Sequence, residues 1–292
     1  MSIATTTHEA VRGTAPRRRR WFGRFALYLA LALSALIFGY PLLWMLIGAG
    51  KSMSDFFADL WWFVPPYRWS NFTEAWSAGS IGRYLANSVF VTAASIVLNL
   101  LVVYPLAYAL ARIRFQGHRL VYGLYAICLF VPVQLMVIPL FSLEKDLGLL
   151  DTYWGLILPY AATTMPFSVV FITAFFRTIP KELEEAATLD GASRFTILVR
   201  IMVPLSVPAF ATSVVFGFLH TWNEFLLALT LTHSPEVRTL PLGLLNFLQQ
   251  QDQPDYAKLF AALAISIVPV LAVFVVSQRQ FLSGLMAGAT KL

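Results

Sequence analysis

Six stretches of this chain are apolar enough, and long enough, to cross a lipid bilayer. A helix needs about 20 predominantly apolar residues to span the hydrocarbon core. Inside that core, a helix is also a form in which each segment satisfies its own backbone hydrogen bonds. The sequence therefore predicts an all-α polytopic membrane protein with six transmembrane helices, at residues 25–47, 86–110, 120–141, 153–175, 208–231 and 258–278.

The composition agrees with lipid as the solvent of this protein. Hydrophobic residues make up 58% of the chain and charged residues only 12%, whereas a soluble domain carries roughly twice that share of charge. The net charge of +6 does not point to nucleic acid, because the basic residues gather beside the ends of apolar runs. With the N-terminus in the cytoplasm, 15 of the 21 Lys and Arg residues fall on the inner side and 6 on the outer side. The positive-inside rule then predicts that both termini and the 176–207 loop are cytoplasmic.

The N-terminal segment differs in character from the rest of the chain. Residues 1–16 are polar and aperiodic, and the run Arg17–Arg20 follows them, so we expect a disordered basic tail over residues 1–20. The first apolar run exceeds the length of a signal-peptide core and is interpreted as an uncleaved anchor. Residues 21–292 form the predicted membrane domain. The single cysteine, Cys128, lies in an apolar run and is expected to be buried and inert.

Several kinds of catalytic and ligand site are absent from the sequence. The four histidines are scattered, so they have no metal-ligand spacing, and no serine or cysteine lies beside a base motif. The segment Gly48–Ser52 looks like the end of a phosphate-binding loop, but Met45 stands where that pattern needs glycine. We therefore expect no metal, no cofactor and no enzymatic activity in this chain.

One acidic residue, Glu224, falls inside a predicted membrane helix. It lies on a polar stripe of the fifth run together with Ser213, Gly217, His220 and Thr221. Because a buried charge in a membrane is costly, this side chain should face the bundle interior and have a partner. Two interpretations stay open, a residue of a transport pathway and a structural hydrogen bond. A proton-coupled secondary transporter that uses Glu224 is the alternative function that this residue suggests.

The loop at residues 176–207, which we call the EAA loop, has the pattern of two short helices around a glycine turn. Pro180 and the acids after it favour a helix start, and Gly191 can take the left-handed conformation that ends a helix. Ser193 can cap a second helix that ends at Pro204. That second helix is expected to have one apolar face, made of Phe195, Leu198, Val199 and Met202. The hairpin could be a docking surface or could rest on lipid headgroups.

The spacing of residues in this loop is similar to a known signature. Glu-Ala-Ala, three residues, Gly, nine residues, Ile and then Pro resembles the signature loop of permease subunits of binding-protein-dependent ABC importers. The matching positions are Glu185, Ala186, Ala187, Gly191, Ile201 and Pro204, with Val203 in place of the commoner leucine. The segments Trp222–Phe225 and Ser283–Lys291, and the pair Asn87-Ser88, resemble the carbohydrate branch, in particular its maltose-type second permease.

The resemblance implies an architecture and a set of partners. It implies the type I ABC importer permease fold in a bacterial inner membrane, a homologous second permease, two cytoplasmic ATPase subunits and an extracytoplasmic sugar-binding protein. The ATPases would dock on the EAA loop, through residues that include Asp190, and drive alternating access for a sugar, which is expected to be an oligosaccharide. The binding protein would contact the 232–257 loop. The candidate pathway residues are His220, Trp222, Asn223 and Glu224, although in this branch the sugar contacts lie largely in the partner permease.

Overall fold

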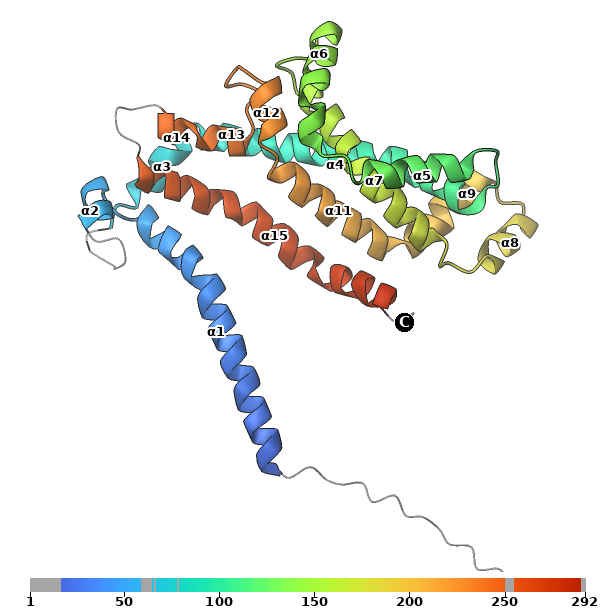
Figure 1. Ribbon diagram of the computed structural model, residues 1–292, viewed down its shortest axis with the longest axis horizontal. Coiled ribbons are helices and arrows are strands. Elements are labelled where there is room, and N and C mark those ends of the chain that lie inside the picture. Colours follow the sequence, from blue (N-terminus) through green and yellow to red (C-terminus); the bar gives the residue numbers. More distant parts are fainter. Residues whose placement is uncertain (1–16, 59–64, 66, 78, 250–254, 290–292) are drawn as a thin grey trace, which may run out of the picture.

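The computed structural model describes residues 17–58, 65, 67–77, 79–249 and 255–289, and within these ranges it contains helices and no strands (Figure 1). Four helices are each long and apolar enough to cross a membrane, and two bent helix pairs bring the number to six if each pair is counted as one span. The four are α1 (Arg17–Ala49), α4 (Ile81–Arg112), α7 (Trp154–Phe176) and α15 (Tyr256–Ala289). The predicted all-α membrane architecture is confirmed. Residues 1–16 of the predicted tail lie outside the described residues, and α1 begins at Arg17.

Helices α4 and α7 run side by side and form the centre of the bundle (Figure 1). Buried polar side chains join them. The hydroxyl of Ser95 donates to the carbonyl oxygen of Ile157 at 3.3 Å, and the amide of Asn99 donates to the carbonyl oxygen of Ala161 at 3.0 Å. In lipid, where apolar burial gives helices little reason to associate, such hydrogen bonds help to hold two helices together. Helix α11 (Val207–Trp222) packs across both, and α15 packs against α11.

Helix α1 leaves the bundle instead of packing along it. In its most apolar stretch none of the residues is buried, and Figure 1 shows the helix diverging from the other elements. Near its C-terminal end, the ring of Trp44 meets Phe260 of α15 at 5.1 Å and Phe56 of α2 (Met53–Ala58) at 6.4 Å. One end of α1 is therefore packed against α15 and α2, whereas the apolar stretch of the helix is not buried within this chain.

The third predicted span, residues 120–141, is not one straight helix. The chain forms α5 (His118–Cys128), a 3-10 turn (Val133–Met136) and α6 (Val137–Leu147), and the two arms meet at 100°. Pro132 directly precedes the 3-10 turn, where its ring removes a backbone donor and restricts the residue before it. Helix α5 has no buried residue, and Cys128 at its end is exposed, so the expectation of a buried thiol is wrong.

The fifth predicted span, residues 208–231, is also broken. Helix α11 ends at Trp222, and α12 (Leu226–Leu231) begins after an interruption at residues 223–225. A second bend, of 77°, separates α11 from the short helices that precede it. Prolines alone do not cause these breaks, because α4 continues through Pro105 and α7 continues through Pro159 and Pro166.

Short helices close the end of the bundle at which α4 begins. They are α3 (Ser70–Ser77), α13 (Leu240–Leu244) and α14 (Asn246–Gln249), and they lie at the opposite end of α4 from the EAA loop (Figure 1). The glutamine-rich part of the predicted 232–257 loop falls partly outside the described residues, which omit 250–254. The 232–257 loop and the EAA loop therefore lie at opposite ends of α4, separated by the length of that helix (Figure 1).

Candidate functional site

The EAA loop folds as two helical segments around a glycine turn, as predicted. Helix α8 (Glu182–Leu189) ends before Gly191, whose φ angle is 81°, a conformation that glycine adopts at no steric cost. Ser193 then accepts a hydrogen bond from the backbone N–H of Thr196 at 3.2 Å and caps α9 (Arg194–Ile197). A π-helical turn (Leu198–Met202) and α10 (Val203–Leu205) follow, so Pro204 lies in the last turn of this segment.

The second helical segment of the loop does not present one apolar face, and that prediction is wrong. Leu198 and Met202 are 6% and 0% exposed and pack beside the end of α4, whereas Phe195 and Val199 are 73% and 46% exposed. Residues four apart form one row on a helix surface. Here one row points into the bundle and the neighbouring row points out. The outward row gives the loop an exposed apolar surface, and Leu189, at 90% exposure, is a further exposed apolar residue of the same loop.

Most of the signature residues lie on the surface of the loop. The exposed ones are Glu185, Ala186, Asp190, Gly191 and Pro204. Ala187 and Ile201 are half-buried and pack against the cluster formed by the ends of α4 and α7. The structure therefore brings the signature together as an exposed surface backed by apolar packing.

A buried ion pair that the sequence did not reveal attaches α8 to α4. Glu184 pairs with Arg112, and the two side chains are only 13% and 7% exposed. The Tyr108 hydroxyl donates to the same carboxylate at 3.1 Å. Arg112 had suggested only membrane orientation and Glu184 only a helix start, because the two are far apart in the chain. The sequence offered only two separate signs, an arginine at the end of an apolar run and an acid directly before Glu-Ala-Ala.

Of the four pathway candidates, Glu224 has a defined structural role. Its carboxylate accepts hydrogen bonds from the backbone N–H groups of Leu227, at 2.8 Å, and Ala228, at 3.1 Å, which are among the first N–H groups of α12. The hydroxyl of Tyr160 on α7 donates to it at 2.8 Å. A carboxylate in this position satisfies donors that a helix start leaves unpaired. These contacts favour the structural interpretation of Glu224 over that of a mobile proton carrier.

The other three candidates differ in their surroundings. Trp222 is buried at 4% exposure and stacks on Phe218 at 5.2 Å, so it is a packing residue. Asn223 is exposed, and its amide donates to the carbonyl oxygen of Leu219 at 2.7 Å. His220 is half-buried, and its Nδ1 has no hydrogen-bond partner among the described residues. Broken membrane helices are tolerated where they are buried in protein or line a wet cavity, and Asn223 and His220 are the two candidates that remain for such a surface.

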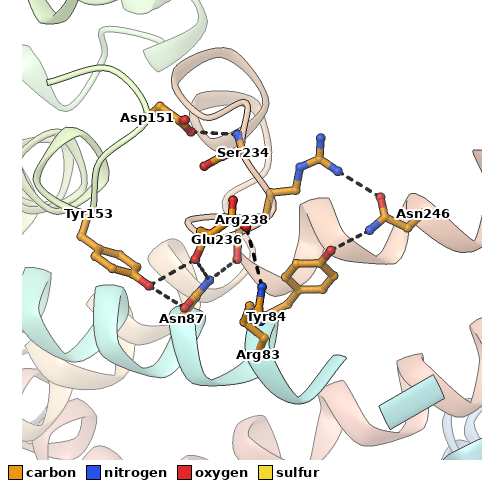
Figure 2. Close-up of polar contacts among 9 residues, drawn as sticks. All are labelled: Arg83, Tyr84, Asn87, Asp151, Tyr153, Ser234, Glu236, Arg238 and Asn246. Atoms are coloured by element: carbon orange, nitrogen blue, oxygen red, sulfur yellow. Dashed lines mark hydrogen bonds and ion pairs between the residues drawn. The ribbon is translucent and has the colours of Figure 1, made fainter. Parts of the chain in front are cut away.

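At the other end of α4, residues 232–240 form a connection that we call the strap. The amide of Asn87 donates to two of its carbonyl oxygens, those of Glu236 at 2.8 Å and Arg238 at 2.9 Å (Figure 2). The Tyr153 hydroxyl donates to Asn87 at 2.9 Å and so fixes the orientation of that amide. Ser88 accepts the backbone N–H of Leu240 at 2.7 Å. The start of α4 therefore holds the strap along its backbone.

Two further contacts fix the ends of the strap (Figure 2). The carboxylate of Asp151 accepts the backbone N–H groups of His233 and Ser234, each at 2.9 Å. Burial raises the pKa of Asp151, but the hydrogen bonds from Ser234 and His233, together with the nearby charge of His233, outweigh burial and lower the pKa below its usual range. Arg238 donates to Asn246 at 3.2 Å, and Asn246 in turn donates to Tyr84 at 2.9 Å. The strap is thus an ordered surface and not a loose loop.

Asn87→Ala should loosen the strap without unfolding the bundle. The substitution removes the amide that donates to the carbonyl oxygens of Glu236 and Arg238. The Tyr153 hydroxyl can still donate to that of Glu236, so the Arg238 carbonyl is the one that loses its donor, and an unsatisfied buried group costs about 1–3 kcal/mol. We expect faster amide hydrogen exchange at residues 233–240 and unchanged exchange in α7. Asn223→Ala is the matched control, because the Asn223 amide bonds only within its own helix. Strap exchange equal to that of the unmodified protein would show that Asn87 does not hold it.

Comparison with known proteins places this architecture in a family. The family described as "Binding-protein-dependent transport system inner membrane component" matches residues 103–285. The probable ABC transporter permease protein YurM of Bacillus subtilis is 39% identical over 94% of this chain and 91% of that protein. The diacetylchitobiose uptake system permease protein NgcG of Streptomyces coelicolor is 36% identical over 88% of this chain and 86% of that protein.

A solved structure agrees with the sequence relatives. A chain of a bacterial ABC transporter involved in the import of the acidic polysaccharide alginate superposes with a TM-score of 0.79 and 25% identity, over 92% of this chain and 99% of that chain. This protein therefore belongs to the family of binding-protein-dependent transport system inner membrane components, the permease subunits that span the membrane in ABC importers.

Proposed function

We propose that this permease forms half of the translocation pathway of a sugar importer, with an oligosaccharide as its substrate. The observation that carries the proposal is the exposed EAA loop on a chain of this family. The substrate class is supported by relatives whose names refer to diacetylchitobiose and by the alginate importer. A homologous second permease would complete the pathway.

The energy would come from partners and not from this chain. Two ATPase subunits would hydrolyse ATP, and this subunit would be non-catalytic. Each ATPase would dock on an EAA loop, through Glu185, Ala186, Ala187, Asp190, Gly191, Ile201 and Pro204 and the exposed row of Phe195 and Val199. Closure of the ATPase pair would move the docked loop, and the permease pair would alternate between inward-open and outward-open states.

The strap would face the partner that delivers the substrate. With both termini and the EAA loop in the cytoplasm, as the distribution of Lys and Arg predicts, the strap lies on the outer side of a bacterial inner membrane. The exposed side chains of Arg83 and Glu236, 59% and 69% exposed and 3.9 Å apart, lie at the strap surface (Figure 2). An extracytoplasmic sugar-binding protein would contact this surface, a role that an ordered strap suits better than a loose one.

A proton-coupled secondary transporter is not favoured. Its best argument was Glu224, and the contacts of that carboxylate with Tyr160, Leu227 and Ala228 give it a structural role. Membership of an ABC importer family also supplies a different source of energy. The His220 and Asn223 side chains stay candidates for the pathway surface, and that role does not require either of them to carry a proton.

Glu185→Lys tests the docking surface. The side chain is exposed on α8, so charge reversal should leave the fold intact. An exposed ion pair contributes about 0–1 kcal/mol, so we expect up to about a fivefold loss of ATPase subunits that co-purify with the permease pair. Asp146→Lys reverses an exposed acid on α6 and is the matched control.

The same preparation tests the substrate class. Reconstituted complex should hydrolyse ATP faster when binding protein and its sugar are added, and a panel of mono- and oligosaccharides identifies the substrate. Unchanged co-purification in Glu185→Lys would place this residue outside the contact. A complex that no sugar stimulates would refute the proposed substrate class.

A further inference from the structure

Helix α4 carries both candidate surfaces, one at each end. Its first turns hold the strap, through Asn87 and Ser88. Its last turns hold α8 of the EAA loop, through Tyr108 and Arg112. The helix is continuous between these points. With a rise of about 1.5 Å per residue, the 25 residues from Asn87 to Arg112 separate the two attachments by roughly 37 Å.

The attachment at the EAA-loop end is built from charge and geometry together. Arg112 pairs with Glu184 through Nε and donates from a terminal nitrogen to the carbonyl oxygen of Ile179 at 2.6 Å. One guanidinium therefore binds the loop at two points, at Ile179 before α8 and at Glu184 within α8. The planar fork of arginine fixes orientation in a way that a lysine cannot. Tyr108 adds a third contact, to the second carboxylate oxygen of Glu184.

Burial makes this attachment resist separation. The side chains of Arg112 and Glu184 are only 7% and 13% exposed, so water cannot replace either partner unless the loop opens. Separating a buried ion pair leaves an uncompensated charge, which is strongly unfavourable. Apolar packing holds the second part of the loop, through Leu198 and Met202. The ion pair holds the first part, α8, whose own side chains are all at least partly exposed.

We propose that Arg112 and Glu184 are positioning residues that fix α8 to α4, so that movement of the EAA loop moves α4 and, through Asn87 and Ser88, the strap. The ATPase side and the binding-protein side of the importer would then communicate through one helix of this chain. The inference rests on the proposed function, since it needs ATPases on the loop and a partner at the strap. Neither residue touches substrate or nucleotide in this scheme.

The first test separates transport from ATP hydrolysis in the complete reconstituted complex. Glu184→Ala and Arg112→Ala should each lower sugar uptake per ATP hydrolysed by roughly tenfold, while ATP hydrolysis stays within about twofold, because α8 still docks but no longer carries α4 with it. The double variant should be no worse than either single variant, since both single variants already remove the ion pair. Arg114→Ala, on an exposed side chain nearby, should match the unmodified complex.

Tyr108→Phe keeps the test valid if the alanine variants fail to assemble. It removes one hydrogen bond to Glu184 and leaves the ion pair, so we expect about a threefold loss of uptake per ATP. The second measurement is hydrogen exchange at the strap with and without a non-hydrolysable ATP analogue. The analogue should change exchange at residues 233–240 in the unmodified complex and in Arg114→Ala, and have no such effect in Glu184→Ala.

Each outcome decides the proposal. Normal uptake per ATP in Glu184→Ala or in Tyr108→Phe, or a strap that still responds to the analogue in Glu184→Ala, would overturn it. If the unmodified complex transports with ATP and Glu185→Lys loses ATPase subunits, the proposed function stands even when the positioning role fails. If the unmodified complex neither binds ATPase subunits nor transports with ATP, both are refuted together.

Discussion

Gly191→Pro is expected to abolish ATP-driven uptake in a chain that still inserts into the membrane. Gly191 has a φ angle of 81°, and proline is fixed at about −65°, so the turn between α8 and α9 cannot form. The residue is exposed, and a Cβ added there would meet no described atom within 4 Å, so the effect is on the turn and not on packing. Uptake should fall to background, and ATPase subunits should no longer co-purify.

Gly191→Asn is the matched control for this prediction. Asparagine tolerates the left-handed conformation better than most residues, and the open space around Gly191 accommodates a side chain. We expect at least about half of normal uptake, because the strain is of the order of 1 kcal/mol. Uptake and ATPase co-purification are measured in membrane vesicles with matched permease levels. Normal uptake in the proline variant would mean that this turn does not shape the docking surface.

Glu224→Leu should also eliminate transport, for a different reason. The carboxylate satisfies two backbone N–H groups at the start of α12 and the hydroxyl of Tyr160. Leucine leaves all three donors unpaired, at about 1–3 kcal/mol for each buried group. We expect lower thermal stability of the purified permease pair and no measurable uptake. Glu224→Gln retains an acceptor oxygen and should keep substantial transport with a smaller loss of stability.

The pair of Glu224 variants also separates the two classes of transporter. An ATP-driven importer needs no proton on this side chain, so collapse of the proton gradient at constant ATP should leave uptake in the unmodified protein and in Glu224→Gln largely intact. A secondary transporter would lose uptake in both cases. An inactive glutamine variant, together with uptake that collapses with the gradient, would refute the importer assignment for this chain.

Features set by neighbouring residues could be predicted from the sequence. The turn at Gly191 and the cap at Ser193 depend on residues within a few positions of each, and both are present. The apolar runs likewise predicted the membrane helices, because their length and composition are local properties. The break at Pro132 could also have been predicted, since proline is a common cause of a sharp bend in a helix.

Features set by distant residues could not be predicted. Glu224 reaches Tyr160 across 64 positions, and Tyr108 reaches Glu184 across 76. No periodicity in one helix identifies a partner on another, so the acids Glu184 and Glu224 had no assigned contacts. The same limit explains the wrong apolar face of the EAA loop. The row that contains Leu198 is buried because α4 lies against it, and nothing within the loop distinguishes that row from its exposed neighbour.

The divergence of α1 has a consequence for how the protein is made. The part of α15 that α1 contacts, around Phe260, is synthesised 216 residues after Trp44, which at roughly 5–20 residues per second takes on the order of 10–40 s. Throughout that interval the packing of α1 against α15 is missing, and the residues of its apolar stretch are not buried even in the finished fold. Its retention in the bilayer during biogenesis must then depend on its own hydropathy, so polar substitutions there should cause loss of newly made protein before any loss of transport.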